Sequence, residues 1–559
     1  TGVAQGRRGA KRRAADPVGN QECIDLMNFR FRREAKYTDD CLYMEDMKDE
    51  GAKRSLVEFV TKAGEKARDS AEDAAVIEWI KDARKREDQE KATQYEGAYV
   101  KDPDLGLHKW IVSFDLNSLY PHLIMQYNIS PETYYDVKTN GVNVDNMLSQ
   151  QVNLKFAKDK NLTIAPNGAM FKRDKQGFLP ELMEKMYGDR VIYKKKMMVA
   201  KKEFQKTKDP IYKNEIARCH NIQMAKKIAL NSAYGAIGNQ YFRYFDVKQA
   251  EAITLGGQLS IRWVERDVNK FMNKVLETDN QNYVVASDTD SIYISMGKLV
   301  DKVCKDKTPQ QISDFLDKVS EQKLQKVIDK SFDNLADYVN AFQQKMVMKR
   351  EAIANKGIWV AKKRYMLNLF DEEGIRYEYP KLKVMGVEAV KSSTPEICRT
   401  KIKEAIRVIM NESEDDLIKY VADFKETFKT LSPEEVAFPR SCNNLMKFAD
   451  SSSIYKKGTP IHVKGALIYN YNLHKHKLEM KYPVIRDGDK IKFLMLKIPN
   501  NIKDTVLSFS SKIPYEFDVH KYVDYDLQFQ KSFTDPLRFI LDSIGWKLER
   551  QATLEAFFG

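Results

Sequence analysis

Residues 110–121 read WIVSFDLNSLYP, a nearly continuous apolar run that ends at an aspartate. A short apolar run of this kind is typical of a strand that is buried on both faces, so Asp115 is expected where that strand ends. A second acidic stretch, SDTDS at 287–291, lies in the turn of a strand–turn–strand pattern over 283–295. The two stretches therefore place carboxylates at the ends of two strands.

Carboxylates on adjacent strand ends suit hard divalent cations, which prefer oxygen ligands and keep several waters. Two such ions about 3.5–4 Å apart can clamp the attacking and leaving oxygens of an in-line phosphoryl displacement. A simpler interpretation stays open, because aspartate favours turns and most Asp pairs in turns bind nothing.

A helical hairpin is predicted downstream. One helical pattern runs from Leu179 to about Lys206, and a second runs from Pro210 to about Gly235. Asp209 supplies an N-cap before a proline at the first helical position. Polar side chains recur on one face of each helix at spacings of three or four residues: Arg190 and Lys194 on the first, and Lys227, Asn231 and Tyr234 on the second.

Three cations and an amide that face one space would suit a triphosphate. Lysines and arginines at helical spacing are more often an ordinary solvated face. The second helix departs from that pattern, because the stretch KKIALNSAYGAIGN is mostly apolar around its lysines. We therefore expect Lys227 to be semi-buried and to need an anion.

The bulk composition limits the functional class. A chain of 559 residues with a net charge of +13 and a pI near 9.0 is long enough for several domains and favours a polyanionic partner. The six cysteines are scattered without a CxxC pair, which argues against a zinc ribbon or a disulfide framework. No apolar run is long enough to cross a membrane, and the chain starts at Thr1, which hints at a fragment or a processed start.

Three motifs, in order along the chain, resemble those that define family B DNA polymerases: DLNSLYP at 115–121, KIALNSAYG at 227–235 and SDTDS at 287–291. The finer resemblance is to the replicative polymerases of large tailed bacteriophages. It extends from about residue 95 to 559 and includes YEGAYVKDP at 95–103, LNSLYPHLIMQYNISPET, NSAYGAIGNQYFRYFD, KKRY at 362–365 and KVMGVEAVKSSTP at 383–395.

The resemblance implies an α+β fold shaped like a right hand, with an antiparallel-sheet palm, helical-hairpin fingers and a mixed thumb. The N-terminal segment is densely charged, with a plausible helix around residues 70–86 and no chemistry that we can assign. The expected divisions are a charged, unassigned or remnant segment at 1–94, palm at 95–177, fingers at 178–240, palm again at 241–390, thumb at 391–545 and a clamp-binding tail at 546–559.

The resemblance also assigns metal and nucleotide roles. Asp115 and Asp290 would be the main ligands of two Mg²⁺ ions, with Asp288 beside them and Glu351 as a further carboxylate nearby. Tyr120 would be the steric gate that rejects a 2′-hydroxyl. The triphosphate would be held by Arg190, Lys194 and Lys227, and Lys227 would be placed to protonate the departing pyrophosphate. The remaining nucleotide contacts are assigned to Asn231, Tyr234, Leu116, Ser118 and Leu119.

Two further contacts follow from the resemblance. The primer-strand backbone would be gripped by Lys362, Lys363, Arg364 and Tyr365, through phosphate contacts that do not read sequence. The C-terminal QATLEAFFG is similar to peptides that dock on sliding clamps, through Gln551, Leu554, Phe557 and Phe558. The alternative for the tail is that its aromatic pair folds back on the thumb.

The expected activity is template-directed addition of dNTPs to a primer 3′ end, in the cytoplasm of an infected bacterial host. The expected partners are primer–template DNA and a sliding clamp, and no membrane. Residues 1–95 hold no convincing Asp-x-Glu exonuclease motif, so proofreading is expected on another chain, lost or cut away. His122 stands where the family motif usually has serine, and it receives no role. An RNA-dependent polymerase and a non-catalytic DNA- and clamp-binding scaffold are the alternatives.

Overall fold

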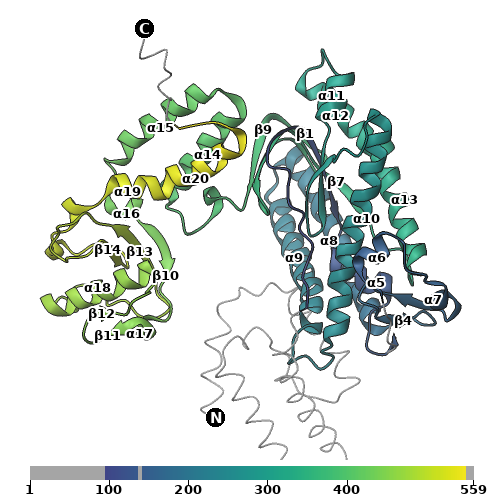
Figure 1. The fold of residues 1–559 in the computed structure, drawn as a ribbon, viewed down its shortest axis with the longest axis horizontal. Coiled ribbons are helices and arrows are strands. Elements are labelled where there is room, and N and C mark those ends of the chain that lie inside the picture. Colours follow the sequence, from purple (N-terminus) through teal and green to yellow (C-terminus); the bar gives the residue numbers. More distant parts are fainter. Residues whose placement is uncertain (1–94, 136–140, 549–559) are drawn as a thin grey trace, which may run out of the picture.

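The structure, a computed structural model, describes residues 95–135 and 141–548. Figure 1 shows two lobes that meet near β9 and α20, with the earlier residues in one lobe and the residues from about 391 onward in the other. Helices and antiparallel sheets are mixed along the chain, which confirms the α+β class. The N-terminal segment 1–94 and the proposed clamp-binding residues 551–558 lie outside the described residues.

Within the described residues, a six-stranded sheet carries both acidic stretches, the one at Asp115 and the one at 287–291. Its strand order is β5-β6-β1-β7-β8-β9, and every neighbouring pair is antiparallel. The predicted strand at 110–114 and the predicted hairpin at 283–295 are both confirmed. The bounds are β1 Gly106–Leu116, β5 Val284–Asp288, β6 Ser291–Ser295, β7 Met348–Ala361, β8 Arg364–Glu372 and β9 Ile375–Met385.

The two faces of this sheet bury alternate residues of β1, as the two-residue period of a strand requires. Val112 and Phe114 belong to the large core shared with α10 and α13, whereas Ile111 packs on the opposite face with Tyr293 and Trp359. Figure 1 shows α10 and α13 beside the sheet. The helices that build this core are α5 Leu119–Tyr127, α10 Val247–Leu276, α12 Pro309–Val319 and α13 Gln325–Tyr338.

The helix α5, which follows directly from β1, packs against α10 at two glycines. A Cβ atom added at Gly257 would lie 3.3 Å from Leu119 Cδ2, and one added at Gly256 would lie 3.4 Å from Tyr127 Cε2. Larger residues there would push α5 away from α10. The glycines thereby fix the position of Tyr120, the second residue of α5.

The predicted helical hairpin is confirmed as α8 Phe178–Thr207 and α9 Pro210–Ile237. Asp209 is the N-cap of α9, where its side chain accepts a hydrogen bond from the amide of Ile211 at 2.9 Å, and Pro210 follows at the first position. The connection turns through Lys208 at a φ of 57°. The helices lie side by side in Figure 1.

Shorter elements complete the first lobe. Their bounds are β2 Tyr134–Tyr135, α6 Val144–Leu148, α7 Lys155–Asp159, β3 Leu162–Ile164, β4 Met170–Lys172, α11 Gly297–Val303 and the π-helical turn Ser320–Leu324.

The second lobe is joined to the sheet by its own apolar cluster, in which Ile358 and Met366 of the sheet pack with Ile402 of α14 and Leu537 of α20. Its helices are α14 Glu396–Asn411, α15 Glu414–Phe428, α16 Pro433–Val436, α17 Leu445–Phe448, α18 Ile461–His476, α19 Tyr525–Phe529 and α20 Asp535–Ile544. Its strands are β10 Phe438–Ser441, β11 Ala449–Asp450, β12 Ile454–Tyr455, β13 Lys490–Met495 and β14 Val506–Phe509. Short helical turns span Glu388–Val390, Tyr515–Phe517, His520–Tyr522 and Gln530–Thr534.

No helix in the described part of the chain is both long and apolar enough to cross a membrane.

Gly386, which directly follows β9, packs against the turn between β7 and β8. Its φ is +67°, and an added Cβ atom would lie 2.0 Å from the carbonyl oxygen of Lys363. We predict that Gly386→Ala lowers the free energy of unfolding by at least about 2 kcal/mol, because backbone atoms must move in addition to the positive-φ strain. Denaturant unfolding of the purified protein measures this change.

Gly374→Ala is the matched control, because Gly374 has a φ of +83° with nothing within 4 Å of its added Cβ. It should cost only about 1 kcal/mol, from backbone strain alone. Equal losses for the two variants would contradict the proposed backbone clash at Gly386.

Candidate active site

The two acidic stretches meet at one end of the central sheet. Antiparallel pairing places Asp115 of β1 opposite Ser291 of β6. The amide of Leu116 then donates to the carbonyl of Asp290 at 2.8 Å, so the tight turn of the hairpin is tied to the end of β1. Thr289 in that turn has a φ of 59°, and its amide donates to the Tyr99 carbonyl at 3.1 Å. Main-chain bonds thus bring the two aspartates together.

The carboxyl groups of Asp115 and Asp290 are electrostatically strained. Burial raises the pKa of Asp115 to about 7, and the negative charges of Asp290 and Glu351 add to the shift. Burial likewise raises the pKa of Asp290 to about 6, and Asp288 and Glu351 contribute. Like charges in a poorly solvated place favour protonation unless a cation neutralises them. The pair is therefore built for a positive partner.

The other two predicted acidic residues, Asp288 and Glu351, form ion pairs with lysines. Lys363 donates to Asp288 Oδ1 at 2.6 Å, and Lys383 donates to Glu351 Oε1 at 2.7 Å. Glu351 also accepts from Ser113 Oγ at 3.2 Å. Across residues 95–135 and 141–548, no three Asp, Glu, His or Cys side chains converge to hold a metal ion.

The donor set fits Mg²⁺ nonetheless. This ion is usually bound through one or two carboxylates, with waters and substrate phosphates completing its shell. Two carboxylates with raised pKa values supply such oxygens, and no sulfur or imidazole ligand is needed.

The helical hairpin brings cations to the same place. Arg190 of α8 donates to Ser118 Oγ at 2.9 Å, beside the end of β1. Lys194 lies 3.9 Å from Glu373, in the turn between β8 and β9. Lys227 of α9 lowers the pKa values of Asp115 and Asp290, so its charge faces the acidic pair. The structure thus gathers Arg190, Lys194 and Lys227 around the sheet end.

The expectation that Lys227 is semi-buried is wrong, because its side chain is exposed. The buried lysine is its neighbour Lys226, which is 6% exposed and pairs with Asp189 of α8 at 3.0 Å. Consecutive helical residues point about 100° apart, as 3.6 residues complete a turn. Lys226 therefore faces α8, whereas Lys227 remains available to a ligand.

Two aromatic rings form one wall of the site. The rings of Tyr120 and Tyr234 lie 4.4 Å apart, and both side chains are half-buried. Burial raises the pKa of each hydroxyl, so both stay neutral. Asn231, one turn before Tyr234, is exposed. Leu116 and Leu119 are buried in the core, which leaves Ser118 as the more accessible side chain of that group.

His122 packs behind the wall. Its ring lies 4.4 Å from that of Tyr187, and its Nδ1 is 2.9 Å from the Ser118 carbonyl oxygen. Burial lowers its pKa, which favours a neutral imidazole.

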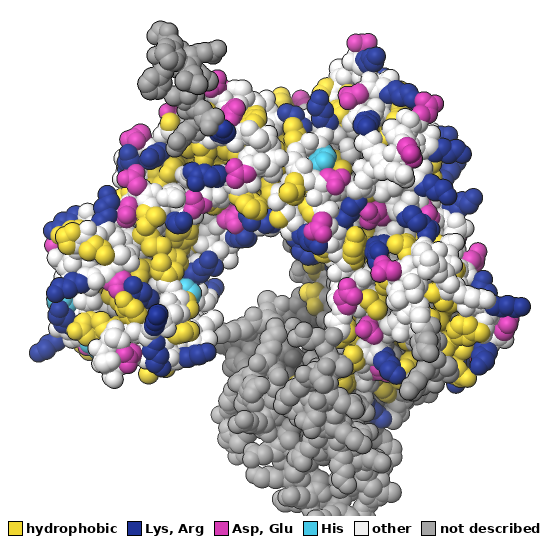
Figure 2. Space-filling view, in the orientation of Figure 1, with side chains coloured by type: hydrophobic (Ala, Val, Ile, Leu, Met, Phe, Trp, Pro, Cys, Tyr) yellow, Lys and Arg dark blue, Asp and Glu magenta, His cyan; other side chains and the backbone are white. Residues whose placement is uncertain are grey.

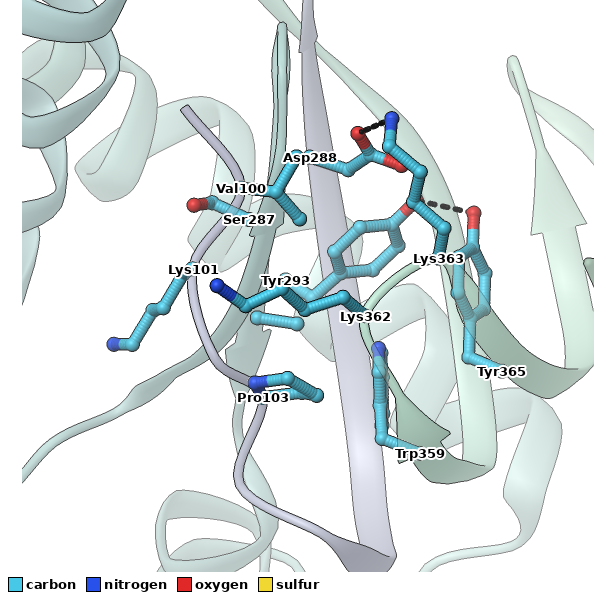
Figure 3. Close-up of a pocket in the computed structure, with 11 residues that line it drawn as sticks. Val100, Lys101, Pro103, Ser287, Asp288, Tyr293, Trp359, Lys362, Lys363 and Tyr365 are labelled. Carbon is cyan, nitrogen blue, oxygen red and sulfur yellow. Dashed lines mark hydrogen bonds and ion pairs between the residues drawn. The ribbon is translucent and has the colours of Figure 1, made fainter. Parts of the chain in front are cut away.

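The KKRY stretch lies at the turn between β7 and β8, beside the acidic hairpin. Lys362 pairs with Asp102 at 3.0 Å, and Arg364 pairs with Glu388 at 2.6 Å. Tyr365 is buried, and its hydroxyl is 2.7 Å from that of Tyr293. Figure 3 shows the pocket that this turn and the hairpin line together. Only the lysines of this stretch are well exposed to a ligand.

Sequence reasoning missed two charged contacts. Lys383 opens the stretch KVMGVEAVKSSTP but had no assigned role, and it lowers the pKa of Asp115 more than Lys227 does. Glu373 was also missed, although it faces Lys194. Both residues come from β9 or its preceding turn, so only the folded sheet brings them to the site.

A hollow lies between the two lobes. In Figure 2, Lys and Arg side chains lie along its upper rim, with Asp, Glu and hydrophobic side chains among them. The Lys and Arg side chains suit a polyanion.

The acidic pair predicts how stability depends on pH. Because the folded pKa values of Asp115 and Asp290 are raised, the folded state binds more protons than the unfolded state between about pH 4 and pH 7. Stability contributed by these groups is present below that window and is lost as the pH rises through it. In EDTA, Asp115→Asn should therefore raise the unfolding midpoint at pH 8 relative to wild type.

The expected gain is on the order of 2 kcal/mol, and it should shrink toward pH 4. Denaturant unfolding at several pH values measures it. Asp306→Asn, which neutralises an exposed aspartate after α11, is the control and should show no such trend. A parallel pH dependence for wild type and Asp115→Asn would contradict the strain at the acidic pair.

Comparison with known proteins agrees with this geometry. Residues 67–329 match the family model described as DNA polymerase family B. The chain is 31% identical over 521 residues to the DNA-directed DNA polymerase of Enterobacteria phage T4, a match that covers 83% of the chain and 57% of the relative. The DNA-directed DNA polymerase of Escherichia phage RB69 is 32% identical over 520 residues, with the same two coverages. A DNA polymerase of Thermococcus gorgonarius is 27% identical over 470 residues, covering 84% of the chain and 49% of the relative.

Residues 67–329 are therefore similar to DNA polymerase family B. Over 83% of its length the chain is similar to the polymerases of phages T4 and RB69, as the motifs predicted. It spans 57% of the length of these two relatives.

Proposed function

We propose that this chain is a template-directed DNA polymerase that adds dNTPs to a primer 3′ end with the help of two Mg²⁺ ions. The main support is that the Asp115–Asp290 pair and the cationic face of the α8–α9 hairpin converge at the same end of the sheet. The acidic pair needs a cation, and the cationic face needs an anion. A magnesium-bound nucleoside triphosphate supplies both charges in one ligand.

The parts of the hand follow from this assignment. The six-stranded sheet and the helices behind it form the palm, and α8 and α9 form the fingers. The lobe from about residue 391 forms the thumb. The hollow between the lobes then receives the primer–template duplex.

Family B DNA polymerases generally depend on a divalent metal. In this chain Asp115 and Asp290 would hold the ions, which supply charge stabilisation at the attacking and leaving oxygens. Asp288 and Glu351 support the site from its edges, where Lys363 and Lys383 hold them.

The fingers bind the nucleotide. Arg190, Lys194 and Lys227 bind and orient the triphosphate, and Lys227, exposed and facing the acids, is placed to give a proton to the departing pyrophosphate. Tyr120 stands under the sugar and excludes a 2′-hydroxyl, backed by the ring of Tyr234. Catalysis here comes mainly from positioning and electrostatics.

Further partners belong to the same proposal. The residues from Gln551 to Phe558 would dock on a sliding clamp, and proofreading would come from an exonuclease that the described residues do not include. The site of action would be the infected bacterial host of a phage. A non-catalytic scaffold would keep DNA and clamp binding without nucleotide addition.

Asp290→Asn tests the proposal directly. Primer extension with Mg²⁺ should fall by at least about a thousandfold, because the cation loses one of its two carboxylates. Primer–template affinity, measured by fluorescence anisotropy, should stay within about threefold of wild type, since the duplex contacts lie elsewhere. Near-wild-type extension would refute the metal assignment. A wild-type protein that binds DNA but adds no nucleotide would establish the scaffold.

Lys226 and Lys227 form a matched pair of adjacent lysines. Lys227→Met should reduce single-turnover nucleotide addition about a hundredfold or more without lowering the unfolding midpoint, because this lysine is exposed and faces the acids. Lys226→Met should lower the midpoint instead, because it leaves Asp189 without its partner. Comparable activity losses from the two variants at equal folding would contradict the separate roles.

A further inference from the structure

Two lysines at the turn between β7 and β8 are paired with acids from a different part of the fold. Lys363 Nζ lies 2.6 Å from Asp288 Oδ1, and Lys362 Nζ lies 3.0 Å from Asp102 Oδ1. In the sheet, β1 lies between β6 and β7. The two ion pairs therefore cross β1, to reach Asp288 in the β5–β6 hairpin and Asp102 in the segment before β1. Figure 3 shows the carboxylate of Asp288 pointing at Lys363.

The backbone of this turn is firmly fixed. Lys363 has a φ of 60°, and Gly386 approaches its carbonyl so closely that no side chain fits between them. Tyr365, two residues on, is anchored by its hydroxyl contact with Tyr293 and by stacking on Trp359 at a ring distance of 5.7 Å. The lysine side chain is therefore the movable part of a rigid turn.

Asp288 faces this turn and pairs with its lysine, although its charge is near enough to Asp290 to contribute to the raised pKa there. Its Oδ1 accepts from both Lys363 and the hydroxyl of Thr289, the latter at 3.1 Å. The described residues contain no three-acid cluster to which Asp288 could belong. The carboxylate is 26% exposed and the lysine is 59% exposed, so the ammonium can contact Asp288 and an external anion together.

We propose that Asp288 is a positioning residue that acts through Lys363, holding its ammonium where it meets a primer-strand phosphate, and that Asp288 does not ligate the metal. This inference rests on the proposed function. A free lysine must lose rotamer freedom when it binds a phosphate, and prior pairing with Asp288 removes part of that loss. The half-exposed ion pair is weak enough to share its cation with the phosphate.

The test is a double-mutant cycle on primer–template binding. A dideoxy-terminated primer without added nucleotide is used, so that binding is read without chemistry, by fluorescence anisotropy. Lys363→Gln should weaken binding about tenfold and reduce the salt slope by about one, as loss of one phosphate contact requires. Asp288→Asn should weaken binding by about three- to tenfold, and the double variant should bind no more weakly than Lys363→Gln.

The expected direction is diagnostic, because removal of a negative charge beside DNA should otherwise strengthen binding. Asp306→Asn removes the same charge elsewhere and should bind at least as tightly as wild type. Asp288→Glu keeps a carboxylate and should retain more binding than Asp288→Asn. A Mg²⁺ titration of single-turnover extension should give the same midpoint for Asp288→Asn and wild type.

The inference is overturned if Asp288→Asn binds as tightly as wild type, if the two losses add, or if the Mg²⁺ midpoint rises several-fold. Failure of the proposed function is distinguishable from these results. It would appear as wild-type protein that adds no nucleotide, while the binding cycle would still report on the Asp288–Lys363 pair.

Discussion

The burial of two neighbouring carboxylates, those of Asp115 and Asp290, among other negative charges is the constraint on which the rest of the site depends. The hydrogen bond from Leu116 to the Asp290 carbonyl holds the two residues together regardless of their charge. Burial then raises both pKa values, and nearby negative charges add to the shifts, those of Asp290 and Glu351 at Asp115 and those of Asp288 and Glu351 at Asp290. The fold keeps this unfavourable arrangement at the end of a well-packed sheet, and a cation bound there would relieve it.

The lysines around this pair fall into two groups, those held in largely buried ion pairs and those that are exposed. Lys383 and Lys226 are largely buried and paired with Glu351 and Asp189, so they are structural counter-ions. Lys227 and Lys363 are exposed at the site, and a ligand phosphate can reach them. This division lets the site stay folded without a ligand and still present cations to a polyanion.

Much of the arrangement was predictable from local sequence. The apolar run before Asp115, the Asp209–Pro210 helix start and the SDTDS turn each gave the correct element, because burial, capping and turn preferences act over a few residues. The motif order also indicated the family whose model matches residues 67–329. Lys227 was misjudged, because an apolar stretch predicts that one lysine is buried but not which of two neighbours faces the adjacent helix.

The sequence by itself determined which residue types the site contains and which strands and helices carry them. Only the tertiary structure decided their pairing. Glu373 reaches Lys194, Lys383 reaches Glu351, and Lys363 reaches Asp288 across strands that are far apart in sequence. The physical reason is that charge–charge interactions depend on distance and burial, which strand order and helix rotation set, and neither is encoded in the spacing of residues along the chain.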